Sequence, residues 1–224
     1  YPISSLLGDH YFYTSRGPAN IDGKVDPSNE FYRNAVARID YIDVANRLTN
    51  EVCKDFTFVH PEVLDEKCSV QYGNLHMENQ VNNEDFKVLI IPSCEVISIS
   101  NLRKITAFYK DGGIVIFTTR LPSRSAEPGR DKEVTRMIRS VFQVAETGQE
   151  MTVSDRSGGR AFFIPFPEGT ALREALRSAG IGFDVDYPDD PEIQYIHKVI
   201  GGRNIFYFAN TGRKRKETQV LLRG

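Results

Sequence analysis

Residues 87–119 constrain the fold most strongly, because they predict one complete strand–helix–strand unit. The stretch opens with an almost wholly apolar run, typical of a strand that is buried on both faces of a sheet. Ser98 or Ser100 can cap the helix that follows, and Gly112-Gly113 ends it before a second apolar run. Two buried strands joined by a helix are expected to be parallel with a right-handed crossover, so the unit predicts an α/β fold.

Apolar periodicity predicts further elements on both sides of this unit. Helices are expected at residues 29–52, 61–66, 134–142 and 172–179, and strands at residues 1–7, 56–60, 69–72, 75–78 and 161–165. The strands at 69–72 and 75–78 are joined through Gly73-Asn74 and predict a β-hairpin insertion. A long polar loop, residues 8–27, is of a kind that is usually functional or in contact with a partner.

The pattern of predicted secondary structure changes after residue 180. Strand patterns at residues 193–200, 203–209 and 219–222 follow one another without an intervening helix, which predicts an antiparallel β-meander. We therefore expect residues 1–180 to form one α/β domain, and residues 181–224 to be either an edge of that domain or the start of a β-sandwich.

Composition limits the classes of partner. The 224 residues carry a formal net charge of −2, which gives no reason to expect a nucleic acid. No apolar run approaches the roughly 18 residues of a membrane span. The chain opens on Tyr1-Pro2-Ile3 without an initiator Met, so we expect it to be a segment of a larger protein.

Three cysteines, Cys53, Cys68 and Cys94, have no metal-ligand spacing, and we expect neither a metal nor a cofactor. A Cys53–Cys68 disulfide with one free thiol is possible in an oxidising compartment. Three buried thiols that behave as small hydrophobic groups are the favoured alternative.

Ligands of an open α/β sheet gather at the carboxyl ends of its strands. Three segments are predicted to lie there: the first loop with Asp9 and His10, the segment around Glu95, and the segment around Arg120. These four residues are the candidate substrate contacts, and no catalytic residue is assigned.

Cys94 follows a predicted buried strand and faces a predicted helix N-terminus, where a thiolate would be stabilised. However, the sequence Pro-Ser-Cys-Glu-Val lacks the glycines of a nucleophile elbow, and Glu95 disfavours a thiolate. An inert Cys94 is therefore favoured over a nucleophile.

Other polar residues are interpreted as structural. His60, His76 and His197 have no partner at metal or acid–base spacing. An acidic cluster is interpreted as a solvated linker, because it lacks the glycine-centred loop of a calcium-binding EF-hand; it comprises Asp184, Asp186, Asp189, Asp190 and Glu192. The basic run at residues 213–216 is interpreted as a solvated turn that protects a sheet edge.

Two stretches resemble a known family. The first, FTFVHPEVLDEKCSVQYGNLHMEN followed by DFKVLIIPSCEVISISNLRKITAFYKDGGIVIFTTRLPSRSAE, is similar to the class I glutamine amidotransferase-like, flavodoxin-like domain of multidomain glycoside hydrolases. The α-L-rhamnosidase-like enzymes resemble it most, and the trimerisation domain of some β-galactosidases resembles it more distantly. The tail QYIHKVIGGRNIFYFANTGRKRKETQVLLRG looks like the stretch that leads those enzymes into a β-sandwich.

The resemblance implies a three-layer sandwich with a mostly parallel central sheet. In true amidotransferases a nucleophilic cysteine follows the strand that corresponds to residues 114–117, but here Thr118-Thr119-Arg120 stands there and Cys94 follows the preceding strand. The amidotransferase triad is therefore absent. The carboxylates of the glycoside hydrolases lie, as the resemblance implies, in a separate barrel.

These expectations favour a non-catalytic accessory domain of a glycoside hydrolase, packing on the catalytic barrel or mediating oligomerisation. Two alternatives stay open: a stand-alone hydrolase or amidotransferase relative that uses Cys94, and a sugar-binding module at the strand ends. Expected partners are other domains of the parent chain, carbohydrate, or a second copy of the chain. The parent protein is plausibly periplasmic or secreted.

Overall fold

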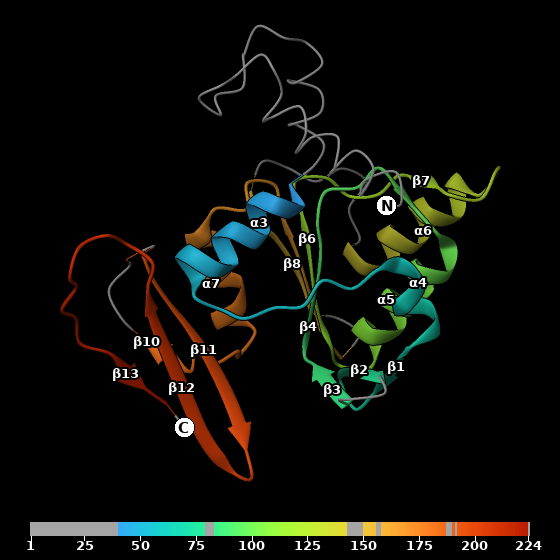
Figure 1. Cartoon of the computed structure of the whole chain (residues 1–224). Coiled ribbons are helices and arrows are strands. Elements are labelled where there is room, and N and C mark those ends of the chain that lie inside the picture. Colours follow the sequence, from blue (N-terminus) through green and yellow to red (C-terminus); the bar gives the residue numbers. More distant parts are fainter. Residues whose placement is uncertain are drawn as a thin grey trace, which may run out of the picture. The chain divides into compact units, whose positions relative to one another are not determined.

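A computed structural model describes residues 40–78, 83–142, 150–155, 158–186, 190 and 192–223 of the chain. These residues belong to two compact units (Figure 1). The first unit contains residues 40–41 and Val59–Phe166, and the second contains Ile42–Phe58 and the residues from Pro167 onward. The strand expected at residues 1–7, the loop at 8–27 and the first part of the helix at 29–52 lie outside the described residues.

A four-stranded sheet forms the centre of the first unit. Its order is β4-β6-β9-β8, and the strands are β4 (Val88–Ile91), β6 (Ile114–Thr118), β9 (Arg160–Ile164) and β8 (Thr152–Ser154). β4 pairs with β6 in parallel, as the strand–helix–strand pattern predicts, and β6 pairs with β9 in parallel, whereas β8 is antiparallel to β9. β6 is buried throughout. The expectation that β4 is buried on both faces was wrong, because its first three residues are half-exposed and, among the described strands, it lies at the edge of this sheet.

Two long helices cover this sheet with an apolar core. Ser98 caps α5 (Ile99–Lys110) by accepting a hydrogen bond from the Asn101 amide, which confirms one of the two predicted caps. α6 (Asp131–Phe142) confirms the helix predicted at residues 134–142. Their buried faces join the sheet in one cluster, whose largest members include Phe108, Tyr109, Phe117, Phe142 and Phe163.

A small antiparallel sheet follows a short helix in the first unit. Helix α4 (Pro61–Glu66) is confirmed, and the His60 ring accepts a hydrogen bond from the Glu62 amide at its start. β1 (Cys68–Gln71) and β2 (Asn74–Glu78) form the predicted hairpin. Its turn residues are Tyr72-Gly73 rather than Gly73-Asn74, and both have positive φ, as a type I′ turn requires. The pattern missed β3 (Asn83–Phe86), which pairs with β2.

The strand expected at residues 56–60 was a wrong prediction. This segment is extended, but among the described residues it pairs with no other strand. Phe56 and Phe58 pack edge to face on each other, with ring centroids 5.1 Å apart, and both rings are exposed. An alternating apolar pattern needs a neighbouring strand to complete its hydrogen bonds, and no strand of the described part of the chain pairs with this one.

The second unit joins two helical segments to a β-ribbon. α3 (Tyr41–Arg47) continues into the π-helical turn η1 (Leu48–Val52), and the carboxylate of Glu51 accepts a hydrogen bond from the Gly169 amide at the start of α7 (Gly169–Ser178). β11 (Ile193–Ile200) and β12 (Arg203–Asn210) form the predicted hairpin through Gly201-Gly202, both with positive φ.

The third strand of the predicted β-meander does not pair with β12. β13 (Leu221–Leu222) instead pairs antiparallel with β10 (Val185–Asp186). The connection from β12 is held by Lys216, whose ammonium lies 2.8 Å from Asp190 and 2.5 Å from Glu192. These hydrogen bonds lower the pKa of Asp190 and raise the pKa of Lys216. Part of the acidic cluster therefore forms ion pairs, and Asp189 lies outside the described residues.

The described residues form a mixed α/β fold with several small sheets, in which most strand pairings are antiparallel. Parallel pairing is found in the four-stranded sheet and between β5 (Val96–Ile97) and β7 (Arg124–Ser125). Across the helices that are described, none is long and apolar enough to cross a membrane.

Candidate functional site

The carboxyl ends of β4 and β6 are held together by Asp40. Its Oδ1 accepts a hydrogen bond of 2.6 Å from the amide of Ser93, which follows β4. Its Oδ2 accepts hydrogen bonds of 2.6 Å from the hydroxyls of Thr118 and Thr119. Asp40 is only 7% exposed, so the carboxylate exchanges its solvation by water for these three donors.

Thr119 adopts an unusual backbone conformation at the same strand end. Its φ is +56°, in the left-handed region that a β-branched residue rarely adopts. The Thr119 amide donates to the carbonyl of Ile164 at 2.8 Å, and its hydroxyl donates to Asp40. These two bonds hold the backbone in a conformation that costs on the order of 1–3 kcal/mol.

Glu95 and Arg120, two of the predicted contact residues, form an ion pair with each other. Arg120 Nη1 is 3.1 Å from Glu95 Oε2, and Arg124 Nε is 3.3 Å from Glu95 Oε1. The Glu95 carbonyl also accepts the amides of Ser123 and Arg124, which places β7 beside β5. Both segments follow strands of the sheet, where they were expected, and contact of either residue with substrate stays a prediction. Asp9 and His10 lie outside the described residues.

Ser93 and Cys94 follow β4 and are buried. Among the described residues, the Ser93 hydroxyl has no hydrogen-bond partner. Burial raises the pKa of the Cys94 thiol to about 12, and the Asp40 carboxylate contributes in the same direction, while Arg120 opposes it. A thiol in such surroundings is protonated at neutral pH and is a poor nucleophile.

All three cysteines are buried thiols that form no disulfide, so the favoured alternative of three thiols is confirmed. We expect native protein at pH 8 to resist iodoacetamide at Cys94, because a pKa of about 12 leaves about one thiolate in ten thousand. Mass spectrometry of intact protein should show no rapid adduct, and three adducts after unfolding in guanidinium. Fast labelling of native Cys94, ahead of Cys53 and Cys68, would contradict this expectation.

The histidines have structural partners. His76 Nδ1 lies 2.7 Å from Asp85 across β2 and β3. His197 contacts Asp184 at 3.2 Å and Asn204 at 2.8 Å, and its ring stacks on Phe206. Within the part of the chain that the structure describes, no three His, Cys, Asp or Glu residues are grouped as a metal site would need.

Asp40 is the site residue that the sequence patterns missed. It falls within the helix expected at residues 29–52, where a single acid among apolar residues carries no obvious signal. Its partners Thr118 and Thr119 are 78 and 79 positions away, so no local spacing connects them. The one available signal is the pair of threonines at a strand end, which need an acceptor once they are buried.

The chain was compared with known families and structures. A family model described as alpha-L-rhamnosidase matches residues 37–223. The chain belongs to the α-L-rhamnosidase family. The resemblance of its sequence to α-L-rhamnosidase-like enzymes is thereby confirmed. None of the curated proteins searched matches it significantly.

A solved rhamnosidase from Novosphingobium sp. PP1Y is similar in structure, with a TM-score of 0.54 and 15% sequence identity. The match covers 71% of this chain and 14% of the Novosphingobium chain. At this identity the match shows a shared fold. This member of the α-L-rhamnosidase family thus spans a small part of the length of the rhamnosidase that it resembles.

Proposed function

We propose that this chain is a non-catalytic accessory domain of a multidomain α-L-rhamnosidase and packs against the catalytic domain of the same protein. The observation that carries the proposal is the strand-end cluster around Asp40. The Thr118 and Thr119 hydroxyls donate to a buried carboxylate, the Ser93 hydroxyl is buried, and the Cys94 thiol is buried and protonated. The groups that could attack a substrate are therefore engaged or inert.

The strand arrangement of the first unit supports a more specific proposal, which names the type of domain. The parallel strands β4, β6 and β9, with α5 as the crossover between the first two, agree with a class I glutamine amidotransferase-like, flavodoxin-like domain. We include in the proposal a domain boundary near residue 180 and a periplasmic or secreted parent protein. A cysteine after β6 would be needed for amidotransferase chemistry, and Thr119 lies there instead.

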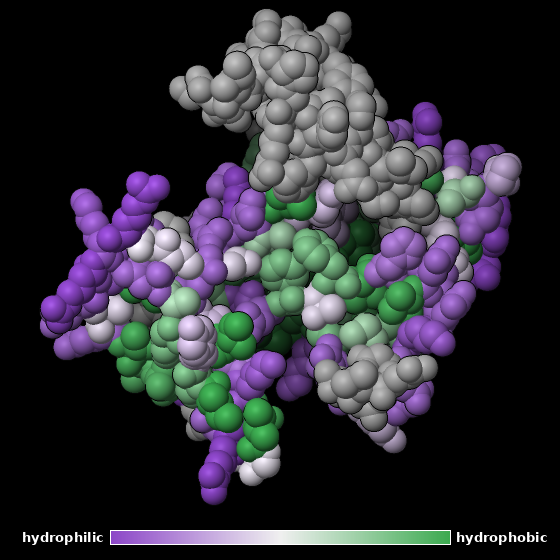
Figure 2. Space-filling view, viewed as in Figure 1, coloured by the Kyte–Doolittle hydropathy of each residue, from purple (hydrophilic) through white to green (hydrophobic). Residues whose placement is uncertain are grey.

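An exposed apolar face on the second unit supports packing against another domain. One face of the β11–β12 ribbon carries Ile196, Ile200, Ile205 and Tyr207, which are 48–66% exposed. Figure 2 shows hydrophobic residues gathered over this ribbon. On the opposite face Tyr195, Phe206 and Phe208 pack on the core of the unit, whereas Val199 near the hairpin turn is 63% exposed. Contiguous apolar surface on a folded domain usually marks a protein interface.

The test compares the chain with its parent protein. We expect the 224-residue chain alone to show no hydrolysis of an aryl α-L-rhamnoside, and the parent protein carrying Cys94→Ala to keep its kcat. Hydrolysis of the rhamnoside by the chain alone, or loss of kcat with Cys94→Ala in a folded parent protein, would overturn the proposal.

A double substitution tests whether the exposed face of the β11–β12 ribbon packs against the catalytic domain. Ile196→Glu with Tyr207→Glu should change the unfolding midpoint of the isolated chain little, because both side chains are already exposed. In the parent protein the same pair should lower the unfolding temperature by several degrees, since about 1–3 kcal/mol of buried apolar contact is lost per side chain. The matched control is Lys214→Glu, at an exposed position of the same unit outside this face, and it should leave the unfolding temperature of the parent protein unchanged. An unchanged parent protein would exclude this face as the interface, and a change in oligomeric state alone would assign it to subunit contact instead.

A further inference from the structure

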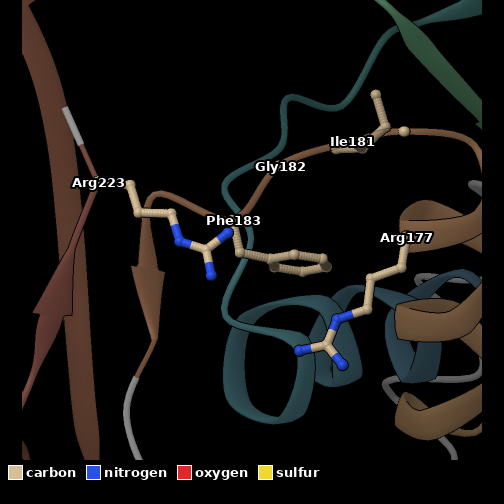
Figure 3. Close-up of a pocket in the computed structure, with 6 residues that line it drawn as sticks. Arg177, Ile181, Gly182, Phe183 and Arg223 are labelled. Carbon is tan, nitrogen blue, oxygen red and sulfur yellow. The ribbon is translucent and has the colours of Figure 1, made fainter.

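A half-open hollow of about 360 Å³ lies in the second unit, beside the end of α7 (Figure 3). It is lined by Arg177, Gly180, Ile181, Gly182, Phe183 and Arg223. Its size is at the lower end of the range of small-ligand pockets, roughly 300–1,000 Å³, and suits a single sugar ring.

The sequence after α7 builds one wall of the hollow. The Gly180 amide donates to the Arg177 carbonyl and the Ile181 amide donates to the Leu176 carbonyl, which together form a Schellman motif. Gly180 has a φ of +80°, which favours glycine. No atom lies within 4 Å of where a Cβ on Gly180 or Gly182 would stand, so the wall leaves room beside the backbone.

Cations surround the aromatic ring at the base of the hollow. The guanidinium carbons of Arg173 and Arg177 are 5.4 and 5.6 Å from the centroid of the Phe183 ring, and the Lys54 ammonium is 5.8 Å from it. Phe183 is only 6% exposed. Figure 3 shows the Arg177 and Arg223 side chains extending toward Phe183 from opposite sides.

Negative charge near these cations is limited. Asp184 pairs with Lys54 at 3.6 Å and with His197 at 3.2 Å, and Arg173 donates to the backbone carbonyl of Glu51. The guanidinium groups of Arg177 and Arg223 form no hydrogen bond or ion pair with any described residue, although the Arg223 backbone amide donates to the Asp184 carbonyl. Two guanidinium groups that share one hollow repel each other, and an anion between them would relieve the repulsion.

We propose that this hollow binds an acidic saccharide unit, a sugar ring that bears a carboxylate. The guanidinium groups of Arg177 and Arg223 present paired N–H donors that match the two oxygens of a carboxylate. Ile181 and the open space beside Gly180 and Gly182 accommodate the sugar ring. The choice of a sugar as the carrier of the carboxylate rests on the proposed role in a glycoside hydrolase. The binding itself requires no catalytic domain.

The experiment titrates the full chain with D-glucuronate and with D-glucose, which differ in that a carboxylate replaces a hydroxymethyl group. Chemical shifts of the Gly180, Gly182 and Phe183 amides in ¹H–¹⁵N spectra report binding at the hollow. We expect saturable shifts with glucuronate and none with glucose. Arg177→Ala and Arg223→Ala should each weaken the binding of glucuronate about tenfold, because each removes about one charge-assisted hydrogen bond. Higher ionic strength should also weaken the binding of glucuronate to the unaltered chain.

The control variant is Arg215→Ala, which removes the same charge from an exposed position of the same unit. Equal binding by Arg177→Ala, Arg223→Ala and the unaltered chain would overturn the proposal, as would the absence of shifts. Inorganic phosphate that binds as tightly as glucuronate would overturn the saccharide assignment. Hydrolysis of an aryl rhamnoside by the chain alone is a separate measurement, so the failure of either proposal is recognised without the other.

Discussion

Asp40→Ala should destabilise the first unit by about 3–5 kcal/mol, because removal of a buried carboxylate leaves its former donors unsatisfied. The Ser93 amide and the Thr118 and Thr119 hydroxyls all donate to this group. The loss is a large share of the roughly 5–15 kcal/mol that stabilises a typical domain. Differential scanning calorimetry should show the unfolding temperature of the unit falling by roughly 8–15 °C.

Two variants separate the hydrogen bonds of Asp40 from its charge. Asp40→Asn keeps one acceptor oxygen, and we expect it to lose about half as much stability as Asp40→Ala. Asp155→Ala is the control, since Asp155 is exposed in the same unit, and it should shift the midpoint by less than about 0.5 kcal/mol. A result in which Asp40→Ala and Asp155→Ala behave alike would show that the strand ends do not depend on Asp40.

Gly159→Ala should be the other strongly destabilising substitution, with a loss of about 3 kcal/mol or more. A Cβ at this position would overlap the carbonyl oxygens of Tyr109 and Gly113, which are backbone atoms and cannot rotate away. The start of β9 lies against the end of α5 at this point, and the Arg160 amide donates to the Gly113 carbonyl. The substitution therefore forces β9 away from β6.

Gly182→Ala is the matched control for this prediction. Its Cβ would meet no atom within 4 Å, and Gly182 does not have a positive φ. The substitution should be neutral or slightly stabilising, because alanine restricts the unfolded chain more than glycine does. Urea unfolding followed by far-ultraviolet circular dichroism compares the two variants. Equal midpoints for Gly159→Ala and the unaltered chain would refute the close approach of β9 and α5.

The local elements were predictable because their signals repeat within a few residues. Helical spacing and a serine cap were sufficient to place α5, and paired glycines were sufficient to turn β11 into β12. The same reasoning placed the segments of Glu95 and Arg120 at strand ends, and the structure adds that the two side chains form an ion pair there. It failed at residues 56–60, where an apolar alternation is present but the described residues supply no partner strand.

Long-range choices needed the tertiary structure. β13 pairs with β10 rather than with β12, and in the connection Lys216 forms ion pairs with Asp190 and Glu192. The basic run at residues 213–216 does not by itself show that Lys216 forms ion pairs. The same run is equally consistent with a solvated turn, which is how its sequence was interpreted. A hydrogen bond between distant residues has no period that a sequence window can detect.

The strand–helix–strand unit at residues 87–119 shows which features the sequence determines and which depend on the tertiary structure. Its apolar runs, cap and glycines establish two parallel strands and their crossover, because backbone geometry and burial act on neighbouring residues. What the two strand ends do was decided only in three dimensions, where Asp40 engages the threonines and burial keeps Cys94 protonated. Solvation and long-range hydrogen bonding depend on every group that surrounds an atom, and only the folded chain brings those groups together.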